Sequence, residues 1–153
     1  MAEQGGDQQE GRQLFCRLIT PERVIYDGEA DLVVARIADG DIGILANHAP
    51  LVSTVGIREV RITHDDERYI FATSDGFFKV SENLVQVLVE EAAPAEEINV
   101  EEAESRVEEA ESELSEAGDD DEEGAERRQA EIERRRAVGE NFARVGREYG
   151  GES

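Results

Sequence analysis

The stretch REVRITHDDERYIFATSDGFFKVSENLVQVLV, from Arg58 to Val89, decides the fold of the first part of the chain. Three of its runs, REVRITH, RYIFAT and LVQVLV, are short and rich in Val, Ile, Phe and Tyr, which favour strands. Between the runs lie pairs of residues that favour tight turns: Asp65-Asp66, Asp75-Gly76 and Glu82-Asn83. In the last run every second residue is Val, which is the period of a half-buried strand. The stretch therefore predicts short strands joined by turns.

The same pattern extends towards the N-terminus. The runs LFCRLI and ADLVVARI have strand composition, and Asp27-Gly28 and Asp39-Gly40 are further candidate turns. Nothing between Gln13 and Val89 has the period of a three-turn helix. Closely spaced strands of this kind predict an antiparallel β-sandwich or barrel.

After Pro94 the apolar period changes from two to three and four residues. Two helical stripes follow, and their members are Val100, Ala103, Val107, Ala110, Leu114 and Ala117 in the first and Val138, Phe142, Val145 and Tyr149 in the second. Asn99 is a candidate N-cap and Gly118 a candidate stop. The two helices are expected to form an antiparallel hairpin.

The seam of this hairpin is thin, because its residues are mostly Ala and Val. Each buried methyl or methylene contributes about 1 kcal/mol, whereas ordering one residue costs about 1–2 kcal/mol. The hairpin is therefore expected to need a second surface to pack on.

Charge divides the chain in the same way as the apolar period. The net charge is -22, and residues 91–124 hold 16 of the 38 acidic side chains but only one of the 16 basic ones. We expect a disordered polar tail over 1–12, a β-sandwich domain over 13–92 and a helical hairpin over 93–153 with an acidic turn at 118–124. So acidic a chain is a poor candidate for binding nucleic acid or an anionic membrane.

The residues needed for catalysis are missing. His48 and His64 stand apart without a cysteine at zinc-ligand spacing, and no phosphate-binding or nucleophile motif occurs. The single cysteine, Cys16, lies in an apolar run and is expected to be buried and inert. No apolar run has the length of a membrane span. We expect a non-catalytic protein with no catalytic residue, no cofactor and no metal site.

Three blocks of sequence, in order and in register, resemble the epsilon subunit of the F-type ATP synthase. They are TPERVIYDGEADLVV (Thr20–Val34), GDIGILANHAPLVSTVG (Gly40–Gly56) and SDGFFKVSENLVQVLVEEA (Ser74–Ala92). The second block is similar to that family's signature G-x-x-G-I-L-x-x-H-A-P-L. The resemblance extends from about Leu14 to Tyr149.

This resemblance implies a ten-stranded β-sandwich followed by a two-helix arm. It implies a central-stalk rotor subunit that couples proton or sodium translocation to ATP synthesis. Its partners would be the gamma subunit, the ring of c subunits and, through an extended arm, the catalytic alpha and beta subunits. The arm would regulate the complex by opposing ATP hydrolysis when extended. The chain would lie at the cytoplasmic face of the inner (plasma) membrane, held there only through the complex.

The resemblance also implies roles for individual residues. Asp41 would face the c ring. The surface towards gamma and the stalk would comprise Gly43, Ile44, Leu45, Asn47, His48, Ala49, Pro50 and Leu51. The basic residues of the regulatory arm would be Arg127, Arg128, Arg134, Arg135 and Arg136. For a single histidine in a turn, chemistry alone favours a structural role over pH sensing. We therefore expect the His48 side chain to form a hydrogen bond that fixes its own turn.

Two positions depart from the family pattern. Ala46 stands where the family usually has Pro, so the turn is expected to be less rigid. The ATP-binding motif of some bacterial members has an Asp and an Arg where this chain has Asn99 and Glu102, and a further Arg where it has Glu109. Acidic side chains repel phosphates, so no ATP sensing by the arm is expected.

Two alternatives remain open from the sequence. The chain could be the same subunit acting in coupling only, with an arm too acidic to inhibit. It could also be an unrelated acidic β-sandwich binding module with a helical tail.

Overall fold

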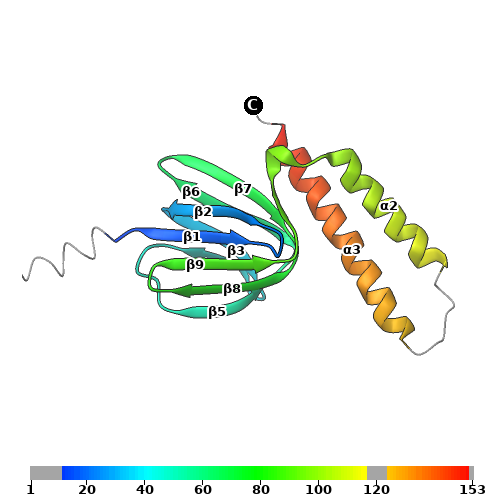
Figure 1. Cartoon of the computed structure of the whole chain (residues 1–153), viewed down its shortest axis with the longest axis horizontal. Helices are drawn as coiled ribbons and strands as arrows, with labels where there is room; N and C mark the ends of the chain where they lie inside the picture. The colour runs from blue at the N-terminus through cyan, green and yellow to red at the C-terminus, as the bar shows by residue number, and fades with distance from the viewer. Residues whose placement is uncertain (1–11, 117–123, 152–153) are drawn as a thin grey trace, which may run out of the picture. The chain divides into compact units, whose positions relative to one another are not determined.

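The chain forms a β-sandwich followed by a helical hairpin, as the sequence predicts. The computed structural model describes residues 12–116 and 124–151. The chain divides into two compact units, Met1–Pro94 and Ala95–Ser153. In the described residues the first unit is built from strands and the second from helices (Figure 1). The expected N-terminal tail up to Gly11, the acidic turn up to Glu123, and the helix stop at Gly118 lie outside the described residues.

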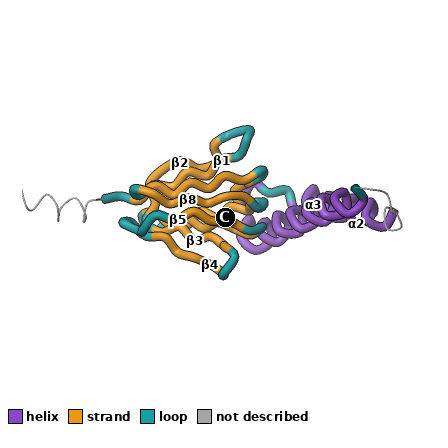
Figure 2. The backbone as a smooth tube through the Cα atoms, turned by 90° about the horizontal axis from the view of Figure 1, so that it is seen from below, coloured by secondary structure: helices purple, strands orange, loops and turns teal. Residues whose placement is uncertain are grey.

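The first unit contains ten strands arranged in two sheets (Figure 2). Their bounds are β1 Leu14–Ile19, β2 Val24–Ala30, β3 Leu32–Ile37, β4 Gly40–Ile44, β5 Leu51–Val55, β6 Arg58–His64, β7 Glu67–Thr73, β8 Gly76–Ser81, β9 Leu84–Val89 and β10 Ala92–Pro94. One sheet has the order β2-β1-β9-β8-β5 and the other the order β10-β7-β6-β3-β4. The ten strands of the sandwich are thus confirmed.

Strand alternation builds the core between the two sheets. In β1, Leu14, Cys16 and Leu18 are buried, whereas the residues between them are partly or fully exposed. The valines of β9 are buried in the same manner, and Phe78 of β8 is the largest fully buried side chain. Because side chains alternate between the two faces of a strand, each buried residue also sets which residues face outwards.

The predicted antiparallel sandwich is confirmed, with one exception among the strand pairs: β1 pairs with β9 in parallel. These two strands are distant in the chain, so no hairpin dictates their relative direction. Asp27-Gly28 is not a turn but part of β2, where Gly28 pairs with Cys16. The ring of Tyr26 lies against Gly28 and its hydroxyl donates to the carbonyl oxygen of Glu29 at 2.7 Å, which favours the extended backbone here.

Other turn predictions are confirmed. Asp65, Asp66, Glu82 and Asn83 all have positive φ values, between 51° and 68°. Positive φ at both central residues is the geometry of the type I′ turn, whose twist matches that of antiparallel strands. These two turns join β6 to β7 and β8 to β9.

The second unit begins with a short 3-10 turn and contains two α-helices. The elements are η1 Ala95–Glu97, α2 Val100–Glu116, α3 Ala125–Val145 and the π-helical turn η2 Gly146–Gly150. The N-cap is confirmed, since the Glu102 N–H donates to Asn99 Oδ1 at 3.0 Å. On the predicted stripes, Ala103, Ala110, Val138, Phe142 and Val145 are buried.

Glycines in the second half of the helical unit let the two halves of the hairpin approach closely. A Cβ added at Gly139 would lie 3.0 Å from a Val107 methyl group, and one at Gly146 would lie 2.8 Å from a Val100 methyl group. A Cβ at Gly150 would lie 2.5 Å from the carbonyl oxygen of Ala95. At these glycines the two halves of the hairpin therefore lie closer together than Ala or Val side chains would allow.

Adjacent glycines provide a matched test of this close packing. Gly150→Ala places a methyl group against a backbone oxygen that cannot rotate away, so it should destabilise the helical unit by about 1–3 kcal/mol. Gly151→Ala, with open space around its added Cβ, should change the stability by less than about 0.5 kcal/mol. Hydrogen exchange of the α3 amides in the full chain measures both. Equal protection in the two variants would contradict the packing described.

Candidate functional site

The turn between β4 and β5 is fixed to the neighbouring β8–β9 turn. Asn47 has a φ of 67°, and its backbone N–H donates to Asn83 Oδ1 at 2.6 Å. The Asn83 side-chain amide donates back to Asn47 Oδ1 at 3.4 Å. His48 Nδ1 lies 2.7 Å from the carbonyl oxygen of Ala49, a contact within its own turn. The turn thus has a defined backbone although Ala46 stands where the signature usually has a proline.

The signature residues divide between core and surface. Ile44 is fully buried, and Leu51 and Ala46 pack against the core as partly buried side chains. Leu45 is 60% exposed, and the other exposed signature residues are Gly43, Asn47, Ala49 and Pro50, with His48 half-buried. The surface part of the signature is small, uncharged and partly apolar.

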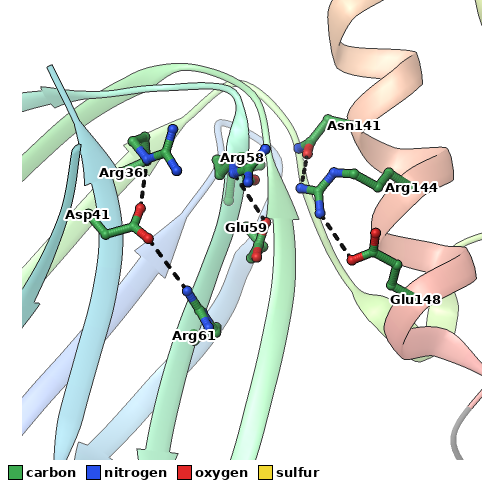
Figure 3. Close-up of polar contacts among 9 residues, drawn as sticks. Arg36, Asp41, Arg58, Glu59, Arg61, Asn141, Arg144 and Glu148 are labelled. Carbon is green, nitrogen blue, oxygen red and sulfur yellow. Dashed lines mark hydrogen bonds and ion pairs between the residues drawn. The ribbon is translucent and has the colours of Figure 1, made fainter. Parts of the chain in front are cut away.

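Asp41 lies at the other end of β4 from this turn. Its Oδ1 accepts a hydrogen bond from Arg36 Nε at 2.6 Å, and its Oδ2 lies 3.7 Å from Arg61 Nη2 (Figure 3). The hydrogen bond from Arg36 holds the pKa of Asp41 below its ordinary value. The structure therefore does not bring Asp41 together with the Asn47–Leu51 turn, and it surrounds this acid with arginine.

The outer face of the β2-β1-β9-β8-β5 sheet carries an apolar row that the sequence analysis missed. Register places Val24 beside Ile19, Ile19 beside Leu88 and Leu88 beside Phe77, across four strands. Phe77 is 61% exposed, Val24 51% and Leu88 44%. We call these four residues the outer apolar row. Val52 of β5, 72% exposed, also faces outwards, but it lies beside Lys79 and not beside Phe77.

A signal for this row was present in the sequence. Phe77 and Phe78 are adjacent in a strand, so their side chains must point to opposite faces and only one can enter the core. Large exposed apolar side chains that gather across several strands mark a surface that a partner covers.

The arginines of α3 are not gathered in one place. Arg127 and Arg128 are exposed in the first turn of the helix, and Arg134, Arg135 and Arg136 are half-buried in its middle. Arg135 donates two hydrogen bonds to the Glu113 carboxylate of α2, at 2.7 and 3.3 Å. This bidentate contact raises the pKa of Arg135 and lowers the pKa of Glu113.

Further contacts join the two helices near the base of the hairpin. Arg147 Nη2 lies 3.4 Å from Glu104 Oε2, and the Arg106 guanidinium lies 5.9 Å from the centroid of the Phe142 ring. Within α3 and η2, Arg144 donates to Asn141 Oδ1 and to Glu148 Oε1 (Figure 3). The hairpin is thus held by charge pairs as well as by small apolar residues.

Cys16 is not a nucleophile. Burial raises the pKa of its thiol to about 12, so the thiol stays protonated at neutral pH. Since thiolate and not thiol is the reactive form, this residue packs as a small core side chain.

Comparison with known proteins identifies the family of this sandwich and arm. The model of the ATP synthase delta/epsilon chain β-sandwich domain matches residues 13–95. An ATP synthase epsilon chain of Rubrobacter xylanophilus is 64% identical over 142 residues, which cover 93% of this chain and 97% of that protein. The chain belongs to the family of ATP synthase epsilon chains.

A further epsilon chain is similar in sequence, and two solved structures are similar in fold. An epsilon chain of Brevibacillus brevis is 42% identical over 94 residues, covering 61% of this chain and 71% of that protein. A chain in the Euglena gracilis mitochondrial ATP synthase assembly of OSCP, F1 and c-ring shares the fold with a TM-score of 0.67 at 20% identity, covering 87% of this chain and 81% of that one. A chain of the central stalk and c-ring of the Tetrahymena thermophila mitochondrial ATP synthase gives a TM-score of 0.55 at 13% identity, with coverages of 88% and 97%.

As an epsilon chain, the protein is a non-catalytic rotor subunit of an ATP synthase. The alternative of an unrelated acidic binding module is thereby excluded. None of the described helices is both long and apolar enough to cross a membrane.

Proposed function

We propose that the sandwich binds the gamma subunit through the outer apolar row, at one end of its sheet, and through the Asn47–Leu51 turn at the other end. The single observation that carries this proposal is the row itself, because its side chains stay in water unless another chain covers them. Fully burying a side chain such as Phe or Leu contributes about 1.5–3 kcal/mol. Along the same strands Arg17, Gln86 and Lys79 face outwards and would form a polar rim.

The composition of the turn suits the same partner. Covering a charged side chain costs free energy unless it is paired, and Asn47, His48, Ala49 and Pro50 include no acidic or permanently charged group. The bonds between Asn47 and Asn83 hold this uncharged turn beside the sheet whose outer face carries the row. The turn and the row thus belong to the same sheet, at its two ends, with the outward side chains of Arg17, Gln86 and Lys79 between them.

At the other end of β4, we propose that the Asp41 region meets the loops of the c ring. Asp41 is exposed and carries two arginine neighbours, so this edge offers both signs of charge to polar loops. Through these contacts the chain would lie at the cytoplasmic face of the plasma membrane, held there by the complex and coupling ion translocation to ATP synthesis.

Docking through the outer apolar row is tested by a charge placed within it. Phe77→Asp should leave the fold intact, since Phe77 already points to water, but should lower co-purification with gamma at least tenfold. Phe77→Leu keeps the position apolar, so this variant should co-purify with gamma as well as the wild-type chain does. Undiminished co-purification of the Asp variant would show that gamma binds elsewhere.

We further propose that the helical unit is a regulatory arm that opposes ATP hydrolysis when it extends into the catalytic head. The unit is compact by itself, and its seam consists of small residues and exposed ion pairs. A seam of this kind leaves the closed and open states only a few kcal/mol apart, which a partner can shift. In the open state the arginines of α3 would meet an acidic segment of the catalytic beta subunits.

The Arg135–Glu113 contact gives this proposal a specific consequence. In the closed hairpin Arg135 is engaged by Glu113, so an acidic partner must compete with that carboxylate. Removing the arginine and removing its partner should therefore act in opposite directions. The eight glutamates of α2 favour the alternative, an arm that serves coupling only. With such an arm, neither change would alter the rate of ATP hydrolysis.

The opposite signs can be measured as ATP hydrolysis by the reconstituted complex. Arg135→Ala should weaken inhibition, whereas Glu113→Gln should strengthen it by releasing Arg135. Each change should stay under about tenfold and shrink at high salt, because exposed ion pairs are weak and screened. Glu111→Gln removes an exposed glutamate of the same helix and serves as the control. Changes of the same sign in both variants would reject competition for Arg135.

A further inference from the structure

Three side chains capable of binding metal, from distant parts of the sequence, lie together at one end of the sandwich. Asp31 lies between β2 and β3, His64 ends β6, and Asp65 opens the following turn. One ligand atom from each of the three lies within 4.8 Å of the other two. We propose that Asp31, His64 and Asp65 form a binding site for a divalent transition-metal ion such as zinc.

The imidazole of His64 is flanked by carboxylates on both sides. Its Nε2 lies 3.3 Å from Glu29 Oε1 and 3.4 Å from Asp65 Oδ2, and its Nδ1 lies 3.5 Å from Asp31 Oδ1. A neutral imidazole carries a single N–H, so in either tautomer one ring nitrogen directs its lone pair at a carboxylate oxygen. In addition, Nδ1 is inaccessible to solvent and has no hydrogen-bond partner. A cation bound to the unprotonated nitrogen removes this repulsion.

The backbone around the cluster is already ordered. The Asp65 N–H donates to Asp31 Oδ2 at 2.9 Å, which leaves Oδ1 on the side of the imidazole. The Gln13 side chain donates to the Ala30 carbonyl oxygen at 2.7 Å and secures the preceding residue.

The ligand chemistry selects the class of metal. One imidazole nitrogen with two carboxylates suits Zn²⁺ and the neighbouring transition metals, whereas Ca²⁺ and Mg²⁺ prefer sites built from oxygen alone. Ligands of tetrahedral zinc, with bonds of about 2.0–2.2 Å, stand about 3.4 Å apart, so the cluster must contract. The Asp65 side chain is 85% exposed and free to move inwards. If Nδ1 binds the ion, Nε2 faces the Glu29 carboxylate, which is not a ligand and can accept its N–H, as is usual for metal-bound histidine.

Strand pairing explains how these residues come together and why the sequence alone did not predict the cluster. Leu32 of β3 pairs with Thr63 of β6, which brings the residues before Leu32 and after Thr63 side by side. No short motif joins residues so far apart in the sequence, so the spacing rules that excluded a metal site could not detect this one. A bound ion would tie the β2–β3 corner to the β6–β7 turn.

Zinc titration of the full chain tests the site, and the only other histidine provides the control. At about 0.15 M salt, which screens the general attraction of an acidic surface, one Zn²⁺ should bind per chain. His64→Gln and Asp31→Asn should each weaken binding about tenfold or more, and His48→Gln should leave it unchanged within about twofold. Mg²⁺ at the same concentration should not compete.

Nuclear magnetic resonance gives a measurement that needs no variant. The unchanged chain has two imidazole rings, and Zn²⁺ should shift the signals of His64 and not those of His48. Zinc binding that His64→Gln does not weaken, equal competition by Mg²⁺, or unshifted His64 signals at saturating zinc would each overturn the proposal. The last result would show that zinc does not bind at this cluster.

Discussion

The apolar layer between the two sheets positions the outer apolar row, the signature turn and the His64 cluster. Phe78 is fully buried, and its neighbour Phe77 therefore faces solvent at one end of the outer apolar row. Ile44 is buried in the same layer, which leaves Leu45 exposed at the start of the signature turn. In β6, Val60 and Ile62 are buried, and His64 follows with the same alternation at the end of the core face. A slip of one residue in any of these strands would exchange inside for outside.

The two units of the chain differ in the kind of interaction that holds them. The sandwich is closed around a continuous set of large apolar side chains, so it is suited to a permanent role in the rotor. The hairpin is held by Ala and Gly contacts and by exposed charge pairs such as Arg135–Glu113. Exposed pairs contribute little free energy and depend on salt, so the hairpin is suited to opening and closing. The proposed division into docking unit and regulatory arm follows from this difference.

Much of the fold could be predicted from local sequence rules. The Asn99 cap, the helical stripes and the turns at Asp65-Asp66 and Glu82-Asn83 depend on neighbouring residues, which the sequence displays directly. The parallel pairing of β1 with β9 could not be predicted in this way, because it joins strands at opposite ends of the sandwich domain. Asp27-Gly28 was misjudged because composition favours a turn where packing of the Tyr26 ring favours a strand.

The candidate sites also divide into those made from neighbouring residues, which can be predicted, and those assembled from distant strands, which cannot. The signature turn is contiguous in sequence and was found, although which of its residues are buried required the structure. The outer apolar row is made from four separate segments and the His64 cluster from two, and only strand register assembles them. The roles of the arm arginines depend on their partners across the hairpin, and Glu113 is not predictable as the partner of Arg135 from spacing alone.

The most direct test compares ATP hydrolysis by complexes assembled with the full chain and with a chain ending at Pro94. The truncated chain should still be incorporated, since the proposed docking surface lies wholly in the sandwich, and the complex should hydrolyse ATP faster. Failure of the truncated chain to join the complex would contradict docking through the sandwich. Equal rates with both chains incorporated would contradict the regulatory role of the arm.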